Sequence, residues 1–193
     1  MDEFKIIITS EEKSEGKGLY IAAIFFLIPT LGLIFSSINN ASAGSAIGGF
    51  VFFIFTLLLY VLGSFQNKKY KQLGETPLTL IPSYCSIGKK ASGSILIGRN
   101  KFNKVKVLSL TCWKTSTDSG STRHDIVWEK IITPNIEFLG SKTTLDFEFT
   151  IPEGKKSTDE RFTSQNKYHW EIGLEFVEKM DALKRTWKIP VKI

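Results

Sequence analysis

Hydrophobic positions follow two different patterns along this chain of 193 residues. Residues 19–66 contain no Asp, Glu, Lys or Arg, and two nearly continuous apolar runs lie inside this block, at about residues 19–38 and 47–65. Helices and strands that face water keep a polar face. The missing polar face therefore predicts two helices surrounded by lipid rather than the buried core of a soluble protein.

Each apolar run is long enough to cross a bilayer as one helix. A run of about 19–20 residues, at a rise of about 1.5 Å per residue, spans roughly 28–30 Å and matches a hydrocarbon core of about 30 Å. The first run is too long for the apolar part of a signal peptide, and the region before it is net acidic. Both features argue against cleavage of this segment.

A short uncharged linker, residues 39–46, joins the two runs and predicts an antiparallel hairpin. Lys68, Lys69 and Lys71 follow the second run directly, whereas the linker contains no Lys or Arg. Because basic residues stay on the cytoplasmic side of a membrane, we expect a multi-pass protein of the inner (plasma) membrane with both termini in the cytoplasm. The three lysines are expected to lie at the surface of the lipid bilayer, near anionic headgroups.

Small residues cluster near the start of the second run, at Gly44, Ser45, Gly48 and Gly49. Small side chains four residues apart allow two helices to approach closely. Two partners remain open for this contact: the first helix of the same hairpin, or a helix of another chain.

From about residue 77 the pattern changes to alternation between apolar and polar residues. The alternation is clearest in residues 145–151, 168–176 and 187–193. A period of two with one apolar face predicts half-buried strands. Further strands are expected at residues 78–81, 94–97, 105–113 and 126–132. Some seven short strands predict an all-β antiparallel sandwich, with its core formed in part by Trp113, Trp128, Trp170 and Trp187.

The charges agree with this division of the chain. Residues 1–18 hold three lysines and five acidic residues, 3 − 5 = −2, and residues 67–193 hold 22 basic and 14 acidic residues, 22 − 14 = +8. The expected segments are a cytoplasmic N-terminal segment (1–18), a transmembrane hairpin (19–66), a basic juxtamembrane linker (67–76) and a cytoplasmic β-sandwich (77–193). The basic surface is interpreted as soluble protein beside anionic lipid, and nucleic acid is not expected as a partner.

Two long polar segments interrupt the alternation, at residues 114–125 and 153–167. Loops of this length in a compact domain are often functional or disordered. If both lie at one end of the sandwich, basic side chains would gather there: Arg123, His124, Lys155, Lys156 and Arg161. Two interpretations remain open, a mixed-charge binding rim for another protein and flexible, solvated hairpin tips.

Motifs for catalysis are absent from the sequence. It contains no HExxH, no GxSxG and no GxxxxGK[ST] phosphate loop. Cys85 and Cys112 have no CxxC neighbour; a bridge between them stays open, although free buried thiols are expected in a cytosolic domain. No catalytic residue, cofactor, metal or small-molecule substrate is therefore expected.

Three segments carry a family resemblance: "FTIP" at residues 149–152, "YHWEIGLEF" at 168–176 and "WKIPVKI" at 187–193. Together they resemble the end of an arrestin-like, immunoglobulin-related β-sandwich. Similar domains lie beside transmembrane helices in uncharacterised bacterial membrane proteins. The resemblance implies a fold and supplies no catalytic residues. This chain differs from many such relatives, which place the domain outside the cell between two helices, because here the domain follows both helices.

These observations favour a non-enzymatic membrane-anchored protein whose β-sandwich mediates protein–protein interaction, as an accessory subunit of a larger membrane assembly. Its partners would be the lipid bilayer and other membrane protein subunits. The alternative is a homo-oligomeric channel or pore-forming effector gated by the sandwich. A third hypothesis is a small hydrolase with Cys112 as nucleophile and His124 or His169 as base.

Overall fold

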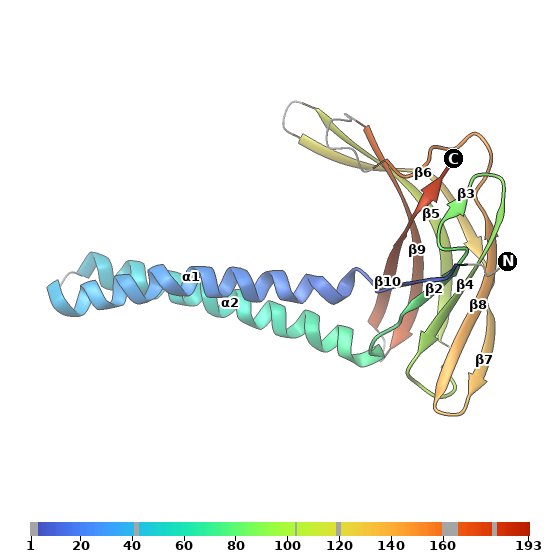
Figure 1. The fold of residues 1–193 in the computed structure, drawn as a ribbon. Coiled ribbons are helices and arrows are strands. Elements are labelled where there is room, and N and C mark those ends of the chain that lie inside the picture. Colours follow the sequence, from blue (N-terminus) through green and yellow to red (C-terminus); the bar gives the residue numbers. More distant parts are fainter. Residues whose placement is uncertain (1–3, 41–42, 103, 119–120, 160–165, 179–180) are drawn as a thin grey trace. The chain divides into compact units, whose positions relative to one another are not determined.

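The computed structural model describes residues 4–40, 43–102, 104–118, 121–159, 166–178 and 181–193. The chain forms two compact units (Figure 1). One unit is the helical segment Glu12–Gln72, and the other combines Met1–Glu11 with Leu73–Ile193. The residues before and after the helices therefore belong to one unit, called the β unit below.

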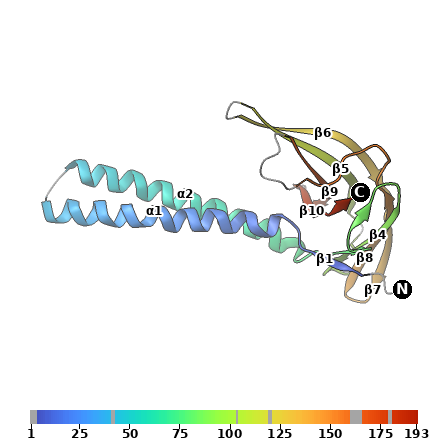
Figure 2. The same ribbon diagram turned by 45° about the horizontal axis from the view of Figure 1, so that its top comes forward.

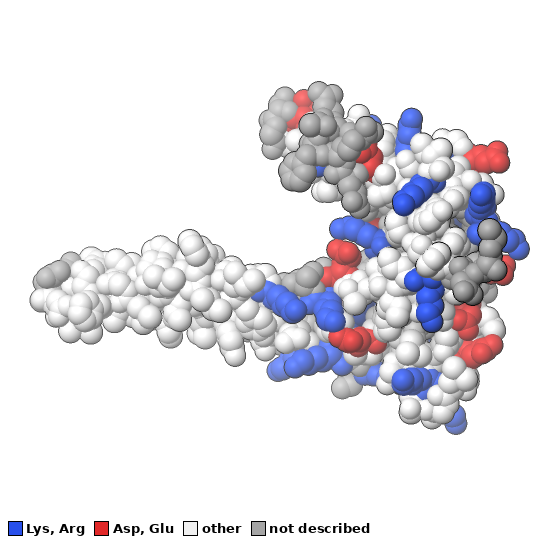
Figure 3. All heavy atoms as spheres, viewed as in Figure 1, with Lys and Arg blue, Asp and Glu red and all other residues white. Residues whose placement is uncertain are grey.

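Two long helices form the helical unit. Helix α1 spans Glu12–Asn40, α2 spans Ala43–Leu73, and the two lie antiparallel (Figures 1 and 2). Both are long and apolar enough to cross a membrane, over Gly16–Asn39 and Ala43–Lys68. Figure 3 shows the surface of the helices free of charged side chains over most of their length. The predicted hairpin of two long apolar helices is confirmed.

Helix α2 is longer than its apolar run. It continues to Leu73 through the segment expected to be a linker, because residues 67–73 contain neither Gly nor Pro. Gly74 follows with a φ of 76°, the left-handed conformation that ends many helices. Hydropathy marks only the part of a helix that suits lipid, so it placed the end of α2 too early.

Small residues line the contact between the two helices. They recur every seven residues, the spacing that keeps one face of a helix against its partner: Gly16, Ala23 and Thr30 on α1, and Gly49, Thr56 and Gly63 on α2. A Cβ atom on Gly16 would lie 3.4 Å from the Gly63 carbonyl oxygen, and one on Gly49 would lie 3.1 Å from Ile34 Cγ1. We call these six residues the small-residue seam, and they allow the two backbones to approach closely.

The hydroxyl groups of the seam form hydrogen bonds within their own helices. Thr30 Oγ1 donates to the Phe26 carbonyl oxygen at 2.7 Å, and Thr56 Oγ1 donates to that of Phe52 at 2.9 Å. The Phe26 ring packs against the rings of Phe52 and Phe55, with centroids 6.2 and 5.0 Å apart. The seam thus satisfies these polar groups without water, as a lipid environment requires.

Two antiparallel sheets make up most of the β unit. The first has the order β1 (Ile6–Ile8), β2 (Leu78–Ile81), β4 (Lys90–Ile97), β8 (Lys142–Thr150), β7 (Asn135–Leu139). The second has the order β10 (Asp181–Ile189), β9 (Asn166–Glu178), β5 (Val105–Asp118), β6 (Ser121–Ile132). A short parallel pair joins β11 (Val191–Lys192) to β3 (Cys85–Ser86). The predicted all-β antiparallel sandwich is confirmed.

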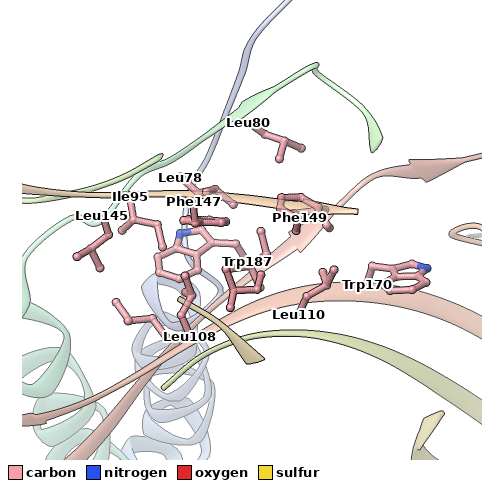
Figure 4. Packing of buried hydrophobic residues seen from close by; sticks show 14 of the residues in the cluster. Leu78, Leu80, Ile95, Leu108, Leu110, Leu145, Phe147, Phe149, Trp170 and Trp187 are labelled. Atoms are coloured by element: carbon pink, nitrogen blue, oxygen red, sulfur yellow. The ribbon is translucent and has the colours of Figure 1, made fainter. Parts of the chain in front are cut away.

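Side chains of both sheets meet in one hydrophobic core (Figure 4). Trp170 and Trp187 are both fully buried, and the Nε1 group of each donates a hydrogen bond of 2.9 Å to a backbone carbonyl, of Lys156 and Thr76 respectively. These bonds remove the cost of burying an indole N–H. Trp128 is only partly buried against this core. Trp113 is the exception to the prediction, because Cys112 occupies the core position beside it and successive side chains of a strand point to opposite faces.

The N-terminal segment is part of the first sheet. Strand β1 pairs antiparallel with β2, with Ile6 opposite Leu80 and Ile8 opposite Leu78. The Glu11 amide donates to the Thr186 carbonyl oxygen of β10 at 2.9 Å. The expected boundary at residue 18 therefore differs from the structure, in which α1 begins at Glu12 and the preceding residues complete the β unit. A strand of three residues is too short to give a periodic signal.

A pair of glycine substitutions tests the packing of the core. Gly93 lies opposite Phe147, whose ring crosses it so closely that a Cβ atom at position 93 would lie 2.6 Å from Phe147 Cε2. We expect Gly93→Ala to lower the free energy of unfolding by about 1–3 kcal/mol through overpacking, as measured by denaturant unfolding of the full chain in mild detergent. The control is Gly98→Ala, since a Cβ atom there meets nothing within 4 Å. Equal stability of the two variants would contradict this packing.

Candidate functional site

The second sheet has different contacts at its two edges. On the β10 side, Glu11 of the N-terminal segment contacts the edge through the hydrogen bond to Thr186 and an ion pair of 3.2 Å between Lys188 Nζ and Glu11 Oε2. On the other side, β6 is the last strand, and in the part of the chain that the structure describes it pairs with β5 alone (Figures 1 and 2). An edge strand presents backbone groups that can pair with another chain.

Large apolar side chains lie along β6. Ile131 is 69 % exposed, Ile126 52 % and Val127 38 %. Trp128 points the other way, toward Trp170, with ring centroids 5.6 Å apart. The register with β5 shifts between Cys112 and Trp113, and at this irregularity Val127 is the extra residue of β6. We call Ile126, Val127 and Ile131 the β6 surface.

Charged residues lie between and beside the apolar residues of the β6 surface, and they restrict which chains could pair with this strand. Arg123, Asp125, Glu129 and Lys130 all lie on this strand. Charges and bulges on an edge strand oppose indiscriminate pairing with other sheets. A partner must therefore match both the apolar side chains and the charges, which favours selective binding over aggregation.

The segment 114–125, expected to be a loop, is the extended end of the β5–β6 hairpin. Lys114 pairs with Asp125, Thr115 with His124 and Ser116 with Arg123. The prediction of a long loop here is wrong because the segment is polar on both faces and so lacks an alternating signal, while its several threonines favour strand. Both Arg123 and His124 are exposed. Arg123 Nε lies 2.8 Å from Asp125 Oδ1, and Thr115 Oγ1 lies 3.0 Å from His124 Nδ1.

Lys155 and Lys156 lie in the segment after β8, whose backbone is held against the sandwich. The Lys156 carbonyl oxygen accepts the bond from Trp170, and the Asp159 amide donates to the Tyr168 carbonyl oxygen at 2.9 Å. The charge of Lys155 acts on Cys112, which pairs with Trp170. The end of this segment reaches the β5–β6 hairpin, where Lys167 pairs with Thr115, the residue opposite His124. Arg161, the remaining member of the expected rim, lies outside the described residues.

A polar cluster that the sequence did not predict lies on the outer face of the second sheet. Trp113 lies opposite His169, and their rings are nearly parallel with centroids 6.4 Å apart. His169 Nε2 lies 3.2 Å from Glu171 Oε1. Burial alone would raise the pKa of Glu171, but the hydrogen bond with His169 and the nearby positive charges, including Lys184, lower it overall. Glu171 is therefore a carboxylate at neutral pH and an acceptor for His169.

Both cysteines are free and buried, so no bridge joins Cys85 to Cys112. Burial raises the pKa of Cys85 to about 12. Burial likewise raises the pKa of Cys112 to about 11, although the charge of Lys155 opposes the change. A reactive cysteine has a lowered pKa and an accessible sulfur, and neither thiol meets this description.

The candidate residues of the helical unit lie in two places, at the end of α2 and at the contact between the helices. Lys68 and Lys71 lie exposed on the last turns of α2, and the side chain of Lys69 lies outside the described residues. Gly48 and Gly49 face α1: a Cβ atom on each would lie 3.6 Å from Leu33 and 3.1 Å from Ile34. A close contact at these glycines is thus made within the hairpin. Ser45 is half-buried and Gly44 is exposed.

No family model matches the sequence, and no curated protein matches it either. Among solved structures, the chain is similar to Spo0M, a sporulation control protein from Bacillus subtilis, with a TM-score of 0.43 and 11 % sequence identity. The match covers 61 % of this chain and 49 % of that protein. The chain thus spans about half the length of that protein. The β-sandwich is confirmed by the strands themselves, and its arrestin-like class stays a prediction from the sequence motifs.

Alkylation measures the state of the two thiols. A thiol of pKa about 11 is ionised to roughly one part in a thousand at pH 8. We expect the folded chain to react with iodoacetamide at pH 8 at least a hundredfold more slowly than an exposed cysteine introduced by Ser141→Cys, and we expect both native thiols to react fully after unfolding. Rapid labelling of Cys112 in the folded protein would contradict its burial and revive the nucleophile hypothesis.

Proposed function

We propose that this protein is a membrane-anchored binding module, whose β unit attaches other proteins to the membrane as an accessory subunit of a larger assembly. The observation that carries the proposal is the uncovered β6 edge with its exposed Ile126, Val127 and Ile131. The opposite edge of the same sheet, β10, is contacted by Glu11 of the chain's own N-terminal segment at Thr186 and Lys188. This difference favours β6 as the edge of that sheet to which a partner binds.

The helical hairpin supports the anchoring part of the proposal. Large apolar side chains such as Phe25, Ile28 and Phe50 are mostly exposed on its surface. Removing each such side chain from water is worth about 1.5–3 kcal/mol, and monomeric soluble proteins rarely expose contiguous apolar patches of this extent. A bilayer covers the whole surface at once, because both helices have the required length.

The pairing of β1 with β2 supports an arrangement with both termini on one side. Strand β1 precedes the hairpin and β2 follows it, yet their residues are hydrogen-bonded neighbours in one sheet. If the hairpin crosses a membrane, its two ends must therefore lie on the same side. Lys68 and Lys71 at the exposed end of α2 favour the cytoplasmic side, so we place the β unit in the cytoplasm.

The mode of binding follows from the chemistry of β6. Its free backbone groups can pair with an extended segment of a partner, and the apolar side chains on the strand can enter pockets of that partner. Main-chain hydrogen bonds would supply affinity, and the charges at Arg123, Asp125, Glu129 and Lys130 would select the partner. No catalytic step is part of this proposal.

Site-specific photocrosslinking in native membranes tests the proposed surface. A photoreactive residue at Ile131 is expected to give a discrete adduct, whereas one at the exposed Lys89, before β4, is expected to give none. Ile131→Asp should weaken co-purification of the adduct partner in mild detergent at least tenfold, because it places a charge where an apolar contact is made. The matched control Ile7→Asp, at an exposed isoleucine of β1, should not.

Two outcomes of this experiment would contradict the proposal. One is equal adduct formation from positions 131 and 89, which would indicate random collision. The other is recovery of the monomer alone from native membranes with no site-dependent adduct, which would remove the binding function.

A further inference from the structure

An apolar groove of about 290 Å³ runs along one side of the helical hairpin. Its walls come from both helices and include Ile24 of α1 and Leu57 of α2, while Ala23 and Thr56 of the small-residue seam form its floor. The groove exists because these floor residues are small: they let the backbones approach and leave no side chain to fill the space above them. The Thr56 hydroxyl bonds to the Phe52 carbonyl oxygen, so the floor presents no unsatisfied donor.

Two tyrosines stand at one end of the groove. The rings of Tyr20 and Tyr60 line it and pack edge to face, with centroids 5.5 Å apart. Aromatic residues of this kind favour the boundary between hydrocarbon and headgroups. The tyrosines thus mark the end of the groove that is nearer to the headgroups.

Positive charge lies just beyond the tyrosines. Lys17 is one turn before Tyr20 on α1, at the spacing that shares a helix face with Tyr20 and Ile24, and Lys68 is two turns after Tyr60 on α2. Both lysines are exposed. Residues 16–74 contain no Asp or Glu, and the acidic residues of the hairpin, Glu12 and Glu15, both lie before Lys17 at the start of α1. From the middle of the hairpin outward, the order is apolar groove, aromatic pair, cations.

We propose that this groove is a binding site for an anionic phospholipid, with one acyl chain in the groove and the headgroup phosphate between Lys17 and Lys68. The apolar groove matches the acyl chain, the tyrosines match the boundary between hydrocarbon and headgroup, and the lysines match the anionic phosphate. A second copy of the hairpin fits less well, because a copy inserted in the same orientation would bring its own lysines to the same level and repel. The inference rests on the membrane insertion proposed above.

Native mass spectrometry of the full chain in mild detergent tests the site. The chain is titrated with dioleoyl phosphatidylglycerol or with zwitterionic dioleoyl phosphatidylcholine. We expect one saturable phosphatidylglycerol site, with an affinity at least tenfold above that for phosphatidylcholine. Lys17→Ala and Lys68→Ala should each weaken phosphatidylglycerol binding about fivefold and leave phosphatidylcholine binding unchanged. The paired control Lys101→Ala with Lys142→Ala, at exposed positions of the β unit, should change neither.

A second pair of variants separates the groove from general contact with lipid. Leu57→Trp fills the groove and should abolish the saturable site, whereas Leu62→Trp, at an exposed position of α2 outside the groove, should leave it intact. Equal affinity of the wild type for the two lipids, or equal effects of the two tryptophan variants, would overturn the site.

Flotation of the wild type with vesicles of each lipid distinguishes the site from the anchor. A chain that floats with both vesicle types but shows no lipid preference in the titration overturns the site alone. A chain that stays in the aqueous fraction with both overturns membrane insertion, and the site with it.

Discussion

The antiparallel pairing of β1 with β2 is the constraint on which the arrangement of the whole chain depends. Three residue pairs, from Ile6–Leu80 to Ile8–Leu78, join a strand before the hairpin to a strand after it. The hydrogen bond from Glu11 to Thr186 then joins the end of the N-terminal segment to β10 of the second sheet. These contacts bring the two ends of a 61-residue helical insertion into one β unit. Glu11 also contacts β10 at Lys188, whereas β6 is the outer strand on the other side of the same sheet.

The small residues of the hairpin account for both the close contact of its helices and the groove beside that contact. Gly, Ala and Thr at seven-residue spacing allow α1 and α2 to approach closely within the hairpin. The same small side chains leave a groove beside the seam where Ala23 faces the space between Ile24 and Leu57. Tight packing between two helices and an apolar space beside them thus have a common cause, and the flanking lysines give that space a chemical preference.

The sequence predicted those features that have a strong period. Charge-free runs marked the helices, and alternation in residues 145–151 and 168–176 marked β8 and β9. Polar strands gave no such signal: residues 114–125 read as a loop, although their threonines pair along the β5–β6 hairpin. Strand β4 begins at Lys90, earlier than expected, because Ser92 and Gly93 lack the apolar character of its second half. Trp113 was expected in the core as a large aromatic residue on a strand, whereas the alternation with Leu110 and Cys112 places it on the outer face.

The candidate sites were harder to predict, because each depends on which elements lie side by side. The charge of Lys155 acts on the Cys112 thiol, a proximity set by the path of the chain after β8 and by no period in the sequence. The groove requires the offset at which Gly16 meets Gly63, which composition does not fix. Glycine spacing alone did not fix a partner for Gly48 and Gly49, and the structure shows that α1 packs against both.

The central claim is that a membrane-embedded hairpin holds the whole β unit on the cytoplasmic side. Single cysteines, one in each unit, measure this most directly: Ala43→Cys at the start of α2 and Ser141→Cys on an exposed turn of the β unit. The measurement is labelling by a membrane-impermeant maleimide in intact spheroplasts, with the buried native thiols as an unreactive background. The account predicts that position 43 is labelled in intact spheroplasts and position 141 only after lysis. Labelling of position 141 before lysis would contradict it.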